Sequence, residues 1–239
     1  MRKIYLILLL LAAPTLIYAA DEANLSALLG GIVQSDSWII RKNKLEEEFA
    51  GNVHFENDIY KIHADRAISR RKEQTYTIEG NVRASRRDKD FSAEITAAKI
   101  FYNNISQTGF AAGDKKSRLT LYYEPAGGPV YRVYGDRLDF ADKFNAFTLS
   151  GNGELHDGRN TLRAGKMSYN RQTGAFEAWG QRPLLTGSND EAYYALQADK
   201  IAANTREGIY RAQGRAQGWI APVKDIKDLK DFTSLPSLK

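Results

Sequence analysis

The sequence contains no cysteine, and its other scarce residues are methionine, at two positions, and histidine and tryptophan, at three each. The absence of cysteine excludes disulfide bonds and excludes a lipoprotein anchored through an acylated cysteine. The histidines are His54, His63 and His156, and no two of them have the spacing of a known metal motif. We therefore expect no metal site and no cofactor.

Motifs of common enzymes are also missing from the chain. No P-loop, no Gly-x-Ser-x-Gly and no zinc signature is present. Three aspartates, Asp65, Asp136 and Asp199, recur in equivalent positions, which admits paired carboxylates but fits a repeated turn or bulge residue better. The sequence therefore predicts a protein that is not an enzyme.

A strong excess of charge of one sign is missing as well. The chain has 34 basic and 29 acidic side chains, and removing Arg2 and Lys3 leaves 32 against 29, a net charge of +3. The densest basic runs are "RRKE" and "RRDKD", which fit solvated turns. Nucleic-acid binding needs a basic stripe, so we expect no nucleic-acid partner.

The N-terminal residues do form one long apolar run. Arg2 and Lys3 precede an apolar stretch from Ile4 to Leu11, and a small residue follows at Ala19. This order predicts a cleaved signal peptide over residues 1–19, followed by a linker over 20–31. A retained membrane anchor is the alternative, although the apolar run is shorter than a spanning helix needs.

A repeat organises the rest of the chain. A small residue, called here the anchor, stands 16 residues before a glycine in each of six units. The anchors are Ser35, Ala64, Ala97, Gly135, Ala164 and Ala198. The glycines are Gly51, Gly80, Gly113, Gly151, Gly180 and Gly214. A constant interval predicts structural glycines aligned on one bend line, because strand glycines mark bulges, bends or close backbone approaches.

Apolar residues keep fixed distances from each anchor. The position two before is always aliphatic, and positions three, five and fourteen after are mostly apolar. Period-two spacing predicts strands, and the change of parity across the anchor predicts a bulge there. The fold predicted is therefore all-β, with units of two strands. We expect these residues to line an apolar groove: Val33, Trp38, Ile62, Ile78, Ile95, Tyr102, Val133, Leu138, Phe140, Leu149, Leu162, Tyr169 and Leu196.

The segments between units vary in length and contain turn residues. Asp157-Gly158 is a two-residue hairpin signal, and the longest unit, 97–135, has room for an extra hairpin. A stack of such units buries its apolar face only if the sheet folds over on itself. The strands at both ends then keep unpaired backbone groups, which favours strand addition by a partner.

The units "IHADRAISRRKEQTYTIEGNV" and "LRAGKMSYNRQTGAFEAWG" strongly resemble the OstA-like repeat of the LptA family of periplasmic lipopolysaccharide-transport proteins. The resemblance covers residues 32–220. It implies an elongated, folded-over β-jelly roll, the "β-taco", which carries lipopolysaccharide in an apolar groove between the inner and outer membranes. It also implies LptC-like and LptD-like partners at open edge strands, with head-to-tail self-association as a further possibility.

Departures from the family pattern occur at Gly113 and Gly180, which lack the following Asn-Val. Two other readings stay open: an LptC-like component anchored in the inner membrane, and a saccharide-binding protein or enzyme built on a parallel β-helix. The polar tail over residues 221–239 is expected to be a short helix, a disordered end or a partner-binding segment.

Overall fold

The computed structural model describes residues 31–222 except 88, 90, 128, 143, 144, 205 and 208. The predicted signal peptide, nearly all of the predicted linker and most of the predicted tail lie outside the described residues. Within the described residues the chain forms strands and one 3-10 turn, Lys42–Lys44, with no α-helix. No helix in this part of the chain has the length and apolarity to cross a membrane.

The strands form one folded sheet of 18 strands, in which every hydrogen-bonded neighbour is antiparallel. This pairing confirms the all-β prediction and excludes the parallel β-helix. The sheet has two halves, which we call half-sheet 1 and half-sheet 2. Long strands bend at mid-length and contribute to both halves: β3 (Glu46–Glu56), β4 (Tyr60–Arg70), β5 (Thr75–Arg87), β6 (Phe91–Asn103), β11 (Ala146–His156) and β12 (Asn160–Asn170).

Short strands complete each half. Half-sheet 1 adds β2 (Ser37–Arg41), β7 (Thr108–Ala112), β10 (Arg137–Ala141), β13 (Ala175–Trp179), β16 (Lys200–Asn204) and β17 (Ile209–Gln213). Half-sheet 2 adds β1 (Ile32–Gln34), β8 (Leu119–Pro125), β9 (Tyr131–Gly135), β14 (Leu184–Ser188), β15 (Ala192–Gln197) and β18 (Gln217–Pro222). The hairpin β8–β9 is the extra hairpin predicted for the longest unit.

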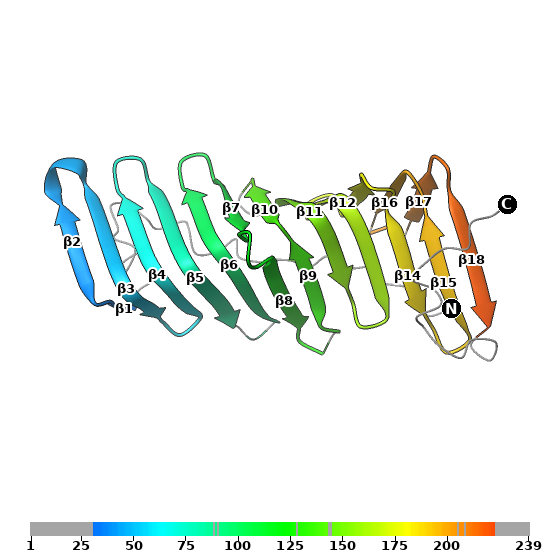
Figure 1. Ribbon diagram of the computed structural model, residues 1–239, viewed down its shortest axis with the longest axis horizontal. Coiled ribbons are helices and arrows are strands. Elements are labelled where there is room, and N and C mark those ends of the chain that lie inside the picture. Colours follow the sequence, from blue (N-terminus) through cyan, green and yellow to red (C-terminus); the bar gives the residue numbers. More distant parts are fainter. Residues whose placement is uncertain are drawn as a thin grey trace.

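The strands follow one another along the longest axis of the molecule (Figure 1). β1 and β2 lie at one end and β17 and β18 at the other. Each repeat therefore contacts its neighbours in the stack, and the two ends of the sheet remain far apart.

Bulges turn the strands over where they pass from one half-sheet to the other. The pairing of β3 with β4 shifts register between Ala50 and Val53, and that of β4 with β5 shifts between His63 and Arg66. Ile62 and Ala64 therefore point to the same side as Ala67 and Ser69, although their sequence parity differs. The bulge predicted beside each anchor is confirmed at these strands.

The space between the half-sheets, called here the interior, contains the main hydrophobic core. Its buried residues come from both halves, for example Leu149, Met167 and Phe176 from half-sheet 1 and Val133 and Leu162 from half-sheet 2. Full burial of one such side chain stabilises the folded state by about 1.5–3 kcal/mol. A smaller cluster at the N-terminal end contains Phe49, Val53 and Ala67, with Val33 against it.

Candidate functional site

The bend line between the half-sheets is built from an aspartate and a glycine. Gly80 has φ +75°, and a Cβ added there would overlap the Asp65 carboxylate and lie 2.7 Å from its Cβ. The Asp65 Oδ2 atom accepts a hydrogen bond from Asn81 Nδ2 at 2.9 Å. Asn81 itself has φ +47°, a conformation in which asparagine is among the most tolerated non-glycine residues. The corner thus needs the Gly-Asn sequence for conformational reasons.

The same aspartate–glycine contact recurs along the stack. It pairs Asp36 with Gly51, Asp136 with Gly151, and Asp199 with Gly214. These contacts confirm the interpretation of the recurring aspartates as bulge or turn residues. In the last corner Arg215 replaces asparagine and donates to Asp199 Oδ1 through Nη2 at 2.7 Å.

Two corners depart from this arrangement, at the glycines that the sequence already marked. Gly165 occupies the aspartate position opposite Gly180, and only its backbone N–H reaches Gly180, donating to the carbonyl oxygen at 2.9 Å. A Cβ at Gly180 would meet nothing closer than 3.6 Å. Gly113 has no positive φ, unlike the other five glycines. Five of the six repeat glycines therefore have positive φ, and the corner at Gly113 has a different backbone conformation.

Inward-facing side chains form continuous rows perpendicular to the strands. In half-sheet 2, cross-strand pairing joins one row from the end strand β1 to β15: Val33, Phe55, Ile62, Ala84, Ile95, Leu121, Val133, Leu155, Leu162, Leu185 and Leu196. In half-sheet 1 the row farther from the bend is aromatic over most of its length: Tyr76, Tyr102, Phe140, Phe147, Tyr169 and Phe176. These rows make the interior apolar along most of the stack.

A third inward row, nearer the bend in half-sheet 1, contains Trp38, Ile78, Leu138 and Leu149. All thirteen predicted groove residues lie in these three rows, but their burial differs. Six are buried: Val133, Leu138, Phe140, Leu149, Leu162 and Tyr169. Six are half-buried: Val33, Ile62, Ile78, Ile95, Tyr102 and Leu196. Trp38 is 57% exposed because it belongs to the end strand β2, although its ring still stacks on Phe49 at 5.6 Å.

The middle of the interior is tightly packed. A cavity of about 30 Å³ lies between the half-sheets, lined among others by Val133, Leu149, Met167 and Phe176. This volume is about that of one water molecule in the liquid, whereas small-molecule sites measure roughly 300–1,000 Å³. In this conformation the central interior is a packed core, so an apolar ligand enters only if the half-sheets separate.

Tyrosines line the interior at some distance from the bend. Burial raises the pKa of the Tyr76, Tyr102 and Tyr131 hydroxyls above the ordinary value of 10.0. Tyr131 also stacks on Tyr123, which in turn lies 5.5 Å from the ring of Phe91. These groups stay neutral at physiological pH, so the tyrosine-lined part of the interior remains uncharged.

Sequence reasoning did not select several of the interior aromatics. Phe147 and Phe176 stand twelve residues after their anchors, as Tyr76 and Tyr210 do after theirs, and both phenylalanines are buried. Phe91 and Tyr123 belong to the segments between units, where no constant interval exists. Only the first pair was therefore accessible from the repeat.

The N-terminal end of the aromatic row is polar instead. Glu47 and Ser69 occupy the positions that aromatic residues hold elsewhere, and both are buried. The Arg71 guanidinium forms an ion pair with the Glu47 carboxylate. A buried carboxylate is costly without such a partner, so Glu47 and Arg71 act together at this end.

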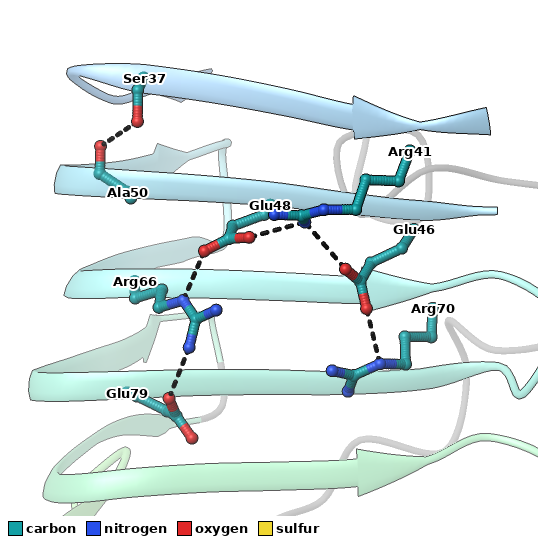
Figure 2. Close-up of polar contacts among 8 residues, drawn as sticks. All are labelled: Ser37, Arg41, Glu46, Glu48, Ala50, Arg66, Arg70 and Glu79. Atoms are coloured by element: carbon teal, nitrogen blue, oxygen red, sulfur yellow. Dashed lines mark hydrogen bonds and ion pairs between the residues drawn. The ribbon is translucent and has the colours of Figure 1, made fainter. Parts of the chain in front are cut away.

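Charged side chains connect the first strands on the outer face of half-sheet 1 (Figure 2). Glu48 accepts hydrogen bonds from Arg66 Nε and Arg41 Nη1, both at 2.7 Å. Arg41 also reaches Glu46 at 2.8 Å, and Arg66 lies 3.5 Å from Glu79. Arg66, and then Arg41, lower the pKa of Glu48 below its ordinary 4.5. The network holds β2 to β5 in register.

Both ends of the sheet carry exposed apolar side chains. At one end these are Ile32, Trp38, Ile39 and Ile40 of β1 and β2; at the other they are Ile209, Tyr210 and Ile220 of β17 and β18. Ile220 is 76% exposed. In the described part of the chain each of these four strands pairs with a neighbour on one edge only. The second edge of each is an unpaired strand edge.

A folded-over stack of antiparallel strand pairs, apolar inside and open at both ends, defines a class of repeat-built β-jelly rolls. A family model described as "LptA/(LptD N-terminal domain) LPS transport protein" matches residues 32–175. The chain belongs to this family of lipopolysaccharide-transport proteins.

Two further comparisons complete this result. No curated protein matches the chain. Among solved structures, one match is "LptH, the LptA homologous periplasmic component of the conserved lipopolysaccharide transport device from Pseudomonas aeruginosa". It is 14% identical, with a TM-score of 0.32, and the match covers 63% of this chain and 82% of that one.

Proposed function

We propose that the protein is a non-enzymatic periplasmic carrier that holds the acyl chains of lipopolysaccharide in its interior. It passes the lipid from the inner toward the outer membrane. The observation that carries this proposal is the unbroken inward row from Val33 to Leu196, which runs from the end strand β1 to β15, the neighbour of the end strand β18. Acyl chains need an apolar environment for their whole length, and a row of this kind supplies it.

Binding requires the half-sheets to move apart, because the central cavity of about 30 Å³ is too small for an acyl chain. The half-buried residues Ile62, Ile78 and Ile95 mark the part of the interior that is less tightly closed. We infer that acyl chains contact this N-terminal part first and replace protein–protein contacts farther along. The apolar surface that loses its protein–protein contacts is then buried against the acyl chains.

The open edges are the proposed partner sites. Neighbouring strands alternate in direction along half-sheet 1, so β17 and β2 run in opposite directions. A second copy, or an LptC-like or LptD-like protein of the same repeat, continues the antiparallel pattern at either end. Such joints place successive interiors in line and give the lipid a continuous apolar path.

Site-specific photocrosslinking tests the binding surface. A photoreactive residue is placed at Ile62, Ile95 or Tyr102, and matched outward controls are placed at His63, Glu94 and Phe101. Adjacent residues of a strand face opposite sides, so each pair differs in face and little else. We expect lipopolysaccharide adducts at the three inward positions only. Equal labelling of both faces, or of neither, contradicts an interior binding site.

The LptC-like, membrane-anchored component remains the second candidate because the N-terminal residues include an apolar run. The two candidates differ in the N-terminus of the mature protein. A carrier released into the periplasm begins near Ala20, whereas an anchored component retains residues 1–19. Mass spectrometry of the protein isolated from cells separates these outcomes.

A further inference from the structure

Two histidines face each other on the outer side of half-sheet 2. His54 of β3 and His63 of β4 are direct cross-strand partners. Their Nδ1 atoms are 3.2 Å apart and their ring centroids 4.3 Å apart. They point outward because their neighbours Phe55 and Ile62 point into the interior. The His54 side chain is 27% exposed and His63 is exposed, so solvent ions reach both rings.

A carboxylate determines where the proton of His54 lies. The Nε2 atom of His54 is 3.1 Å from Glu56 Oε2. An ionised carboxylate only accepts hydrogen bonds, so Nε2 carries the proton and the neutral ring keeps its lone pair on Nδ1. The close Nδ1 atom of His63 must then be the donor. If His63 moves its proton to Nε2, both Nδ1 lone pairs become available to one ion.

We propose that His54 and His63 chelate a divalent transition-metal ion through their Nδ1 atoms. Metal–nitrogen bonds of about 2.0–2.1 Å in tetrahedral geometry separate two ligating nitrogens by roughly 3.3 Å. The observed 3.2 Å matches this separation. Imidazole nitrogen suits Zn²⁺, Ni²⁺ and Cu²⁺, and a carboxylate on the second ring nitrogen is the usual outer partner of a metal-bound histidine.

The site is a two-ligand chelate. The described residues contain no group of three histidine, cysteine, aspartate or glutamate side chains placed for one ion. Water completes the coordination sphere. Lys61, which pairs with Glu56 at 2.5 Å, and Arg83, the cross-strand neighbour of His63, add positive charge nearby. The small number of protein ligands and the nearby positive charge both weaken metal binding, so we expect an affinity below that of a structural zinc site.

The location of the histidine pair means that a bound ion would affect the N-terminal edge of the sheet. It joins β3 to β4 beside the end strand β1, whose Gln34 is the cross-strand neighbour of His54. A bound ion therefore cross-links the strands that support the N-terminal edge. Because the folded state alone brings the two rings together, metal binding stabilises the fold.

Metal titration of the full mature chain without an affinity tag tests the proposal. Calorimetry with Cu²⁺, Ni²⁺ and Zn²⁺ is expected to give one ion bound per chain. The affinity of the chain for Cu²⁺ is expected to exceed its affinity for Ni²⁺. The melting temperature should rise with metal and fall back with a chelator. His54→Gln and His63→Gln should each lower the affinity at least tenfold. Glu56→Gln should lower it by about tenfold, as outer-partner losses do.

The third histidine of the chain is the matched control. His156 lies on the same outer face, and its partners are Glu154 and Thr161 rather than another histidine. His156→Gln should bind metal as the parent does. Binding that survives the double variant His54→Thr/His63→Thr, folded by circular dichroism, overturns the proposal. So does an equal loss in His156→Gln, or no measurable binding by the parent.

Discussion

Gly80, next to the Asp65 carboxylate, illustrates how a single glycine fixes the bend. Positive φ and the adjacent carboxylate both exclude a side chain at Gly80. We predict that Gly80→Val destabilises the protein by about 1–3 kcal/mol, the usual cost of a strained backbone residue. Gly151→Val, beside Asp136, should behave in the same way. Denaturant unfolding measures both.

A matched control separates the clash from backbone strain alone. Gly158 has φ +88° but lies in a turn where an added Cβ would meet no atom within 4 Å. Gly158→Val should therefore cost less than Gly80→Val. Equal losses at the two positions would mean that the aspartate contact contributes nothing to the corner.

Glu48 makes the charged network sensitive to acid. Arg66 and Arg41 lower its pKa from the ordinary 4.5, so the network stabilises the folded state above that value. This stabilisation is lost as the pH falls through the lowered pKa. Glu48→Gln should reduce the melting temperature at pH 7, and the gap between variant and parent should narrow in acid below about pH 4.5. Glu73→Gln, in the exposed turn after β4, should show no such gap.

At this scale the sequence predicted which way side chains point but not how deeply they are buried. Trp38 and Met167 share one repeat position, three after the anchor, yet Trp38 is exposed and Met167 is buried. Depth depends on whether further strands and the opposite half-sheet cover a position, and the repeat carries no such information. The pair His54–His63 was missed for a related reason, because it depends on the register of one hairpin.

At the scale of elements, the corners between the half-sheets differ in sequence, and the residues of one corner can be introduced into another by mutation. Gly165–Gly180 lacks the aspartate and the asparagine of the corner at Asp65, Gly80 and Asn81. We predict that Gly165→Asp combined with Gln181→Asn stabilises the protein by roughly 0.5–1.5 kcal/mol, the typical net contribution of one hydrogen bond. The midpoint of denaturant unfolding measures the gain.

The reverse change provides the comparison. Asp65→Gly removes the carboxylate from a complete corner and adds chain entropy to the unfolded state, so it should destabilise. A stabilised Asp65→Gly variant, or a destabilised double variant at Gly165 and Gln181, would contradict the role given to the aspartate.

The strand pairs were the most predictable elements. The change of parity across the anchor predicted strands with a bulge beside the anchor, and β4 and β12 have that form. Asp157-Gly158 predicted the turn between β11 and β12, and Asp157 N–H donates to the Asn160 carbonyl oxygen at 3.1 Å there. The crossing from β7 to β8 was less accessible, because residues 113–118 lie in the segment of variable length.

For the whole molecule, the two open ends predict a specific pattern of association. Proline in an end strand removes a backbone donor and blocks strand addition. Ile39→Pro in β2 and Arg211→Pro in β17 should each abolish self-association while the monomer stays folded. Light scattering and thermal melting measure both properties.

Mixing the two variants tests the direction of the joint. The first keeps an intact C-terminal edge and the second an intact N-terminal edge, so a head-to-tail joint allows them to form a dimer and nothing larger. If one variant still associates with itself, the joint is symmetric instead. If the parent is monomeric at all concentrations, the ends serve other partners only.

The continuous inward rows have a consequence for movement along the stack. Neighbouring strands are about 4.8 Å apart, and each step of that length replaces one aliphatic contact, such as Ile62, by another, such as Ala84 or Ile95. If the half-sheets separate as proposed, a lipid in the interior would meet similar aliphatic contacts at each step along the row. Under a concentration difference between the two ends, thermal diffusion along such a row would then suffice for net flow in one direction.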